Sequence, residues 1–129
     1  LRDYKEGLLD ILQGKTPDAP LQVEIHPYYE AQDSGCNNVC DWCTRLTDKF
    51  ELRKKKEAGT NPDSMIAFVK SLAGRGVKRI IISGNSTEPL MYPRIDEVIR
   101  AIKESGMIIR LFSNFYFGEK IIDVFTSLA

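Results

Sequence analysis

The clearest structural signal in this chain is the segment Val77-Lys78-Arg79-Ile80-Ile81-Ile82-Ser83. It is rich in β-branched and apolar residues, which is typical of a strand buried within a parallel sheet. A polar loop follows at 84–93. Apolar residues at helical spacing then predict a helix that begins near Ile95 and ends at Gly106. A strand followed by a helix is the repeating unit of α/β folds.

The same unit recurs before and after this stretch. Upstream, alternation predicts a strand at 21–25, and Asn61 and Pro62 supply the start signals of a helix over 62–74. Downstream, we expect a third strand at 107–113 and a third helix from Ile121 to Leu128. Strand and helix thus alternate three times, which predicts an α/β fold with a parallel sheet and right-handed crossovers. Three strands leave a sheet edge that more chain or another subunit is expected to cover.

Size and composition limit the function classes. The chain has 129 residues, 43% hydrophobic and 28% charged, with a formal net charge of zero. These values are ordinary for one globular domain or less, and nothing in the net charge indicates nucleic acid or an acidic membrane surface. No apolar run suits a membrane span or a signal peptide. We expect a helix at 3–13 within an N-terminal extension (1–20), a core domain at 21–129, and a cytoplasmic location that keeps thiols reduced.

All three cysteines of the chain stand in Cys36-Asn37-Asn38-Val39-Cys40-Asp41-Trp42-Cys43, a C-x3-C-x2-C spacing. Disulfide pairing would leave one thiol over. Three thiolates on one loop can hold three corners of an iron–sulfur cube, leaving one iron open to a ligand. Buried structural thiols or a zinc knuckle are the alternatives. Zinc usually takes four ligands, and His26 is the chain's only histidine.

This cysteine loop, placed after a strand and with Trp42 before its last cysteine, resembles that of the radical S-adenosylmethionine enzymes. The resemblance implies the first half of a partial (βα)6 TIM-like barrel, with Cys36, Cys40 and Cys43 as ligands of a [4Fe-4S] cluster. It also implies that S-adenosylmethionine binds the remaining iron and is cleaved reductively to a 5'-deoxyadenosyl radical, which abstracts hydrogen from a substrate. Trp42 would lie near the adenine, or only shield the cluster from solvent.

Two further loops resemble cofactor-binding segments of that family. Ser86-Thr87-Glu88-Pro89 follows the second predicted strand and resembles the family's Gly-Gly-Glu-Pro segment, with Ser86 and Thr87 in place of the glycines. By resemblance, this loop and Glu88 take the cofactor's amino group. Ser113-Asn114-Phe115 resembles a Thr-Asn-Gly segment, so Ser113 and Asn114 are expected to contact the cofactor. A solvated glutamate and ordinary turn chemistry are the alternatives.

The remaining features leave the substrate open. His26 ends the first strand and is expected to be structural, with a backbone partner, rather than an acid–base group. Arg53-Lys54-Lys55-Lys56 is expected to be a solvated helix face within a helix at 46–58. The resemblance implies an enzyme that takes electrons from a flavodoxin- or ferredoxin-type reductase and acts on a small molecule or peptide. A non-catalytic iron–sulfur or zinc module, or a scaffold, is the rival hypothesis.

Overall fold

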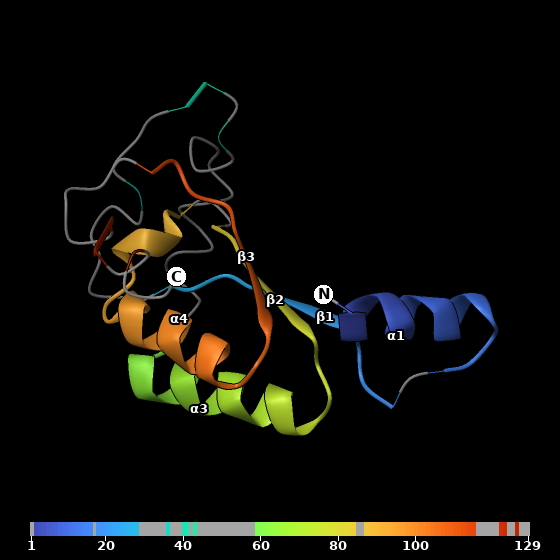
Figure 1. Ribbon diagram of the computed structural model, residues 1–129. Helices are drawn as coiled ribbons and strands as arrows, with labels where there is room; N and C mark the ends of the chain where they lie inside the picture. The colour runs from blue at the N-terminus through green and yellow to red at the C-terminus, as the bar shows by residue number, and fades with distance from the viewer. Residues whose placement is uncertain are drawn as a thin grey trace.

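The computed structural model describes residues 2–16, 18–28, 36, 40, 41, 43, 59–84, 87–115, 122, 123 and 126. Within this part of the chain, a three-stranded sheet carries two helices, α3 and α4, side by side on one face (Figure 1). The elements in chain order are α1 (Arg2–Leu12), β1 (Gln22–Ile25), α3 (Pro62–Gly74), β2 (Arg79–Ile82), the 3-10 helix η2 (Pro89–Met91), α4 (Ile95–Glu104) and β3 (Ile108–Leu111).

The sheet is parallel throughout, in the order β1-β2-β3. Ile25 pairs with Ile82, and Ile82 with Leu111, so the three strands end in register at one edge. The predicted α/β fold with a parallel sheet is confirmed. The register also means that the segments following the three strands all leave the sheet at the same edge, where ligands gather in folds of this kind.

The hydrophobic core lies between the sheet and the two helices. Ile80 and Ile82 of β2 are fully buried, as are Val69 of α3 and Val98 of α4. Each such side chain contributes about 1.5–3 kcal/mol when it leaves water. The predicted buried strand is therefore confirmed, although it spans 79–82 rather than 77–83. Before it, the N–H groups of Lys78 and Arg79 both donate to the Leu21 carbonyl, at 3.0 and 3.1 Å.

The two core helices begin in different ways. At α3, Asn61 caps the helix by accepting a hydrogen bond from the Ser64 N–H (2.8 Å), as the sequence predicts. At α4 the residue before the helix is Arg94, in the left-handed region (φ 57°) and without a side-chain cap. The Arg94 guanidinium instead donates to Glu97 at 2.6 and 2.7 Å, and to Asp63 of α3 at 2.7 Å. It thereby joins the starts of both helices.

The segment at 84–93, expected to be a polar loop, contains η2, and four of its described residues, 88–90 and 92, are buried. Pro89 and Leu90 lie inside, and Tyr92 is only 2% exposed. The Tyr92 hydroxyl donates to the Thr60 carbonyl, just before α3. The segment differs from the predicted polar loop because it carries apolar side chains that complete the core over α4.

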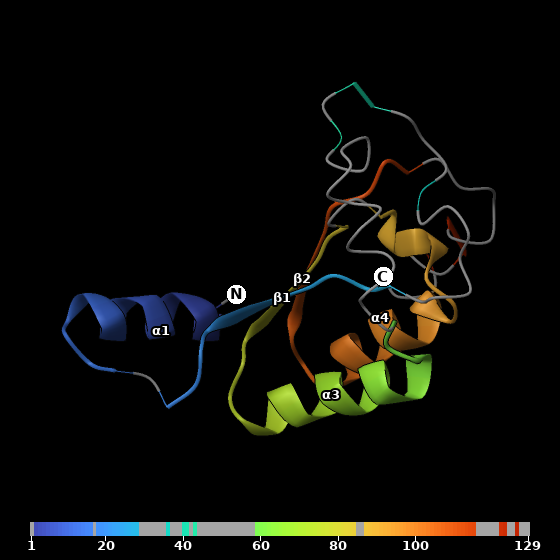
Figure 2. The same ribbon diagram turned by 180° about the vertical axis from the view of Figure 1, so that it is seen from behind.

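The helix α1 projects from the body beside the N-terminal end of the sheet (Figures 1 and 2). It agrees with the predicted helix at 3–13 to within one residue at each end. Gly7 lies so close to Leu21 that an added Cβ would come within 2.6 Å of its side chain, and the Arg79 guanidinium stacks on the Tyr4 ring at 3.8 Å. Among the described helices, none has the length and apolar character needed to cross a membrane.

Two predicted helices are described only in part or not at all. In the predicted third helix, Ile122, Asp123 and Thr126 are helical, and the other residues of 121–128 lie outside the described part. The predicted helix at 46–58, with its basic run, lies wholly outside the described residues.

Candidate functional site

The segments with predicted chemistry follow β1, β2 and β3 at the same edge of the sheet. The cysteine loop follows β1, the Thr87–Glu88 segment follows β2, and Ser113 and Asn114 follow β3. Parallel pairing in register brings these three segments together although they are far apart in the sequence.

Glu88 is the centre of the contacts between the second and third segments. It is the one charged residue among the buried residues of the described chain, at 4% exposure. Its Oε1 accepts hydrogen bonds from the Leu90 N–H (3.1 Å) and the Ser113 hydroxyl (2.7 Å). Its Oε2 accepts from the Asn114 N–H (2.8 Å). Three donors thus compensate the cost of burying this carboxylate. In the structure, the hydrogen-bond donors to the Glu88 carboxylate belong to the protein's own chain.

The backbone before Glu88 is folded tightly on itself. An added Cβ on Gly84 would stand 1.6 Å from the Thr87 carbonyl oxygen, so a side chain cannot fit there. The Thr87 hydroxyl is buried and has no hydrogen-bond partner among the described residues. Such an atom is rare in proteins and marks a place where a bound molecule or water can supply the missing partner. The predicted site residue Ser86 lies outside the described residues.

The segment after β3 is held by Ser113. The Ser113 hydroxyl donates to Glu88 and accepts from the Phe115 N–H (2.9 Å). Phe115 has a φ of 52°, in the left-handed region that glycine adopts readily. The family segment that this one was predicted to resemble carries glycine at this position. The backbone here therefore has the conformation that a glycine would favour, with a phenylalanine in its place.

Asn114 connects this segment to the cysteine loop. Its side-chain Nδ2 lies 3.8 Å from the Cys36 sulfur, within the range of a weak N–H···S hydrogen bond. Further along, the Cys43 N–H donates to the Cys40 carbonyl (2.9 Å), which closes a turn. None of the three cysteines forms a disulfide, and each is partly buried. Trp42, predicted to lie near the cofactor, is outside the described residues.

The three thiols are not gathered around one point. In the part of the chain that the structure describes, no three His, Cys, Asp or Glu side chains lie close enough to hold a metal ion together. The structure brings Glu88, Ser113, Asn114 and Cys36 into one network and leaves Cys40 and Cys43 outside it.

Sequence reasoning missed a polar cluster beside this network. The Ser83 hydroxyl lies 2.5 Å from Glu24 Oε1 and 3.0 Å from His26 Nδ1. His26 was expected to bond to backbone, and its partner here is a side chain. The alternation along β1 is the available signal, because it places Glu24 and His26 on one face and Ile25 on the other.

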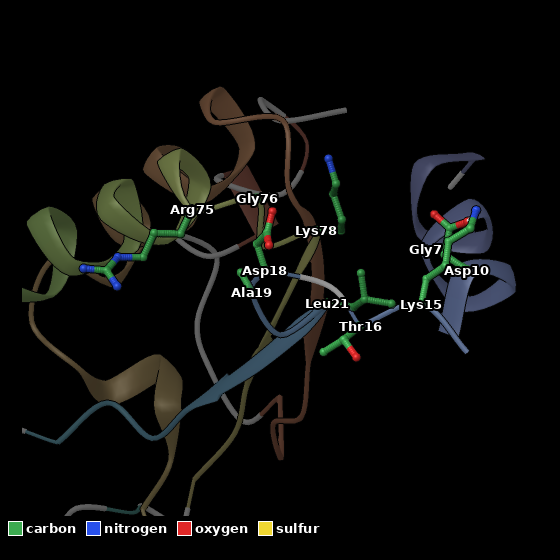
Figure 3. A pocket seen from close by; sticks show the side chains of 10 residues that line it. All are labelled: Gly7, Asp10, Lys15, Thr16, Asp18, Ala19, Leu21, Arg75, Gly76 and Lys78. Carbon is green, nitrogen blue, oxygen red and sulfur yellow. The ribbon is translucent and has the colours of Figure 1, made fainter. Parts of the chain in front are cut away.

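A cavity of about 360 Å³ lies elsewhere, between α1, the segment before β1 and the turn after α3 (Figure 3). It is at the N-terminal end of the strands and contains none of the predicted site residues. Charged groups of both signs line it, among them Asp10, Lys15, Asp18, Arg75 and Lys78. The Lys15 amine is already paired with Asp10 at 2.6 Å. The cavity therefore gives no support to the predicted chemistry.

No protein-family model, no curated protein and no solved structure matches this chain.

Proposed function

We propose that this chain belongs to a radical S-adenosylmethionine enzyme in which Cys36, Cys40 and Cys43 hold a [4Fe-4S] cluster. When bound, the reduced cluster supplies the electron that splits S-adenosylmethionine into methionine and a 5'-deoxyadenosyl radical. The observation that carries the proposal is the contact of Asn114 with Cys36 at the edge of the sheet. It links the cysteine loop with both of the other segments that resemble cofactor-binding segments.

The donor set suits such a cluster by its chemistry. Three cysteines on one short loop supply soft thiolate ligands, which iron–sulfur clusters prefer. The fourth iron position would stay open for the cofactor. The buried hydroxyl of Thr87, at the same edge of the sheet, is a second supporting observation, because it lacks a partner within the part of the chain that the structure describes. A cofactor with amino, carboxylate and hydroxyl groups can satisfy it.

The described residues suggest a division of roles. Glu88 positions the segment after β3, since its carboxylate already accepts three hydrogen bonds from the chain itself. The acceptors for the cofactor's ammonium are then the backbone carbonyls of this loop and the hydroxyls of Ser86 and Thr87. Ser113 orients the loop through its bonds to Glu88 and Phe115. Trp42 is proposed to shield the cluster and to stack on the adenine.

The proposal includes a finer fold and the partners that it needs. The three βα units would be the first half of a partial (βα)6 barrel, with further chain or a second subunit pairing along β3. An external one-electron reductase of the flavodoxin or ferredoxin type would supply electrons in the cytoplasm. The substrate would be a small molecule or a peptide.

Anaerobic reconstitution tests the proposal. The purified chain is incubated with iron and sulfide, and iron, sulfide and zinc are then determined. We expect about four irons and four sulfides per chain. When the chain or subunit that completes the barrel is also present, reduction in the presence of S-adenosylmethionine should release 5'-deoxyadenosine. Serine variants of Cys36, Cys40 and Cys43, made singly, should lose most of the iron.

Each other outcome has a distinct meaning. Stoichiometric zinc without iron would favour the rival zinc module. A cluster that forms without any cleavage of S-adenosylmethionine would favour the non-catalytic iron–sulfur module. Unchanged iron in all three serine variants would contradict the ligand assignment. Ser71→Ala is a matched control, because Ser71 lies on α3 and its hydroxyl donates to the Phe68 carbonyl of its own helix.

A further inference from the structure

Glu24, Ser83 and His26 form a polar cluster on the face of the sheet opposite the hydrophobic core. Glu24 and His26 flank the buried Ile25, and their side chains are 48% and 46% exposed. Ser83 directly follows Ile82, the partner of Ile25, and its N–H donates to the Ile25 carbonyl at 3.1 Å. The sheet ladder therefore fixes the spacing of the three side chains, and half of the surface of two of them stays accessible.

The number of hydrogens on these side chains decides which group donates and which accepts each hydrogen bond. The Ser83 hydroxyl has one proton, and the 2.5 Å distance to Glu24 Oε1 assigns this proton to a bond with the carboxylate. At 3.0 Å from His26 Nδ1, the Ser83 oxygen must then act as acceptor. Nδ1 of His26 therefore carries a hydrogen, and in the neutral ring Nε2 carries the lone pair.

Nε2 is the atom of this cluster that remains available to a ligand. Within the described part of the chain, the charged group found near Nε2 is Glu24 Oε1 at 3.8 Å, which is beyond hydrogen-bond distance. The two arginines on this face have aromatic neighbours, Arg79 over Tyr4 and Arg110 over Phe112.

We propose that Glu24, Ser83 and His26 form a proton-accepting site for the O–H or N–H group of a substrate bound over this face of the sheet. In the step, the O–H or N–H bond of the substrate breaks, its electron pair stays on the substrate, and a new N–H bond forms at Nε2. The imidazolium later returns the proton to water. His26 is the catalytic residue, and Ser83 and Glu24 are positioning residues. The assignment of a substrate here rests on the proposed function, because the cluster lies at the sheet edge that carries the cysteine loop.

The tautomer of His26 provides the first test, because His26 is the only histidine of the chain. Long-range 1H–15N correlation spectra of the 129-residue chain, without iron, report which ring nitrogen carries the hydrogen. We expect the Nδ1–H tautomer in the wild type and a change toward Nε2–H in Ser83→Ala. Ser71→Ala should leave the spectrum unchanged. A wild-type histidine with its hydrogen on Nε2 would overturn the proposal.

Proton transfer provides the second test, with 4-nitrophenol as a probe whose ionised form is coloured. At a fixed pH near 6 the ionised fraction of the free probe is set by the pH, so the absorbance can change only through bound probe. With the chain in excess over a micromolar concentration of probe, the wild type should increase the absorbance of the phenolate. His26→Gln should abolish the increase and Ser83→Ala should reduce it, while Ser71→Ala should not change it. An equal increase in His26→Gln, or none in the wild type, would overturn the proposal. Neither test uses iron or S-adenosylmethionine, so a failure here is distinguishable from a failure of the proposed function.

Discussion

The carboxylate of Glu88 accepts a hydrogen bond from the backbone N–H of Asn114 at 2.8 Å, across 26 positions of sequence. The bond joins the loop after β2 to the loop after β3. The other carboxylate oxygen of Glu88 accepts hydrogen bonds from the Leu90 N–H and the Ser113 hydroxyl. A carboxylate with this many internal donors holds two loops in place. This arrangement sets the position of Asn114 and, through it, the distance to Cys36.

The first prediction concerns this carboxylate. In Glu88→Gln, an amide NH2 group replaces one of the two acceptor oxygens. The donor that bonded to this oxygen then faces another donor and loses its hydrogen bond. We expect the free energy of unfolding to fall by about 1–3 kcal/mol. Chemical denaturation of the reconstituted and the metal-free chain measures it. Glu104→Gln is the control, because Glu104 is exposed at the end of α4 and should change stability by less than about 0.5 kcal/mol. Equal effects of the two substitutions would contradict a structural role for Glu88.

The second prediction compares two glycines. In Gly84→Ala the new methyl group would meet the Thr87 carbonyl oxygen at 1.6 Å, so the loop must move. We expect a loss of about 2 kcal/mol or more, together with altered amide chemical shifts at Thr87 and Glu88. Gly74 ends α3 and has no atom within 4 Å of the added position. Gly74→Ala should therefore be neutral or stabilising by up to about 1 kcal/mol.

The sequence predicts the parts of this fold that depend on local pattern. The three isoleucines of β2 and the Asn61-Pro62 start of α3 carry strong local signals, and the structure confirms both. Contacts made across the sheet have no such signal. The burial of Glu88 depends on donors 25 and 26 positions away, and the bond from Ser83 to Glu24 depends on strand pairing. The sequence predicts a polar loop at 84–93 because the apolar side chains that are buried there are spaced irregularly.

The third prediction concerns the side chain of Asn114. Asn114→Ala removes Nδ2, which lies 3.8 Å from the Cys36 sulfur, and keeps the backbone N–H that binds Glu88. Hydrogen bonds to cluster sulfurs favour the more negative, reduced form. The reconstituted variant should therefore retain its iron but have a more negative reduction potential, as measured by an EPR-monitored redox titration. Asn61→Ala, at the start of α3, should lose about 1 kcal/mol of stability without a change in potential. The same shift in both variants would contradict this role.

The fourth prediction concerns the backbone at Phe115, whose φ is 52° and whose side chain is 62% exposed. In Phe115→Gly, the relief of strain and the greater freedom of the unfolded chain should nearly cancel. In Phe115→Val, a β-branched side chain is forced into the left-handed region. We expect the valine variant to be less stable than the glycine variant by about 1–2 kcal/mol. Thermal and chemical unfolding of the two variants, measured side by side, gives this difference in stability. A valine variant as stable as the glycine variant would show that the positive φ is absent in solution.

The fifth prediction concerns pH and the contacts of Arg94. The pKa of Glu97 is lowered from its usual value of 4.5, mainly by the hydrogen bonds from Arg94, and the pKa of Arg94 is raised, first by Glu97 and then by Asp63. Because the lowered pKa belongs to the folded state, the stabilisation by Glu97 is complete above pH 4.5 and disappears as the pH falls through the lowered value. In Arg94→Asn, which keeps a residue that tolerates positive φ, the pKa of Glu97 should return toward 4.5. An NMR titration of the Glu97 carboxyl carbon measures this pKa. Adding 0.5 M NaCl should bring the pKa of Glu97 closer to 4.5 in the wild type but not in Arg94→Asn, because both groups are exposed to solvent and salt screens their attraction. If Glu97 titrates identically in the two proteins, Arg94 does not join α3 and α4 through this carboxylate in solution.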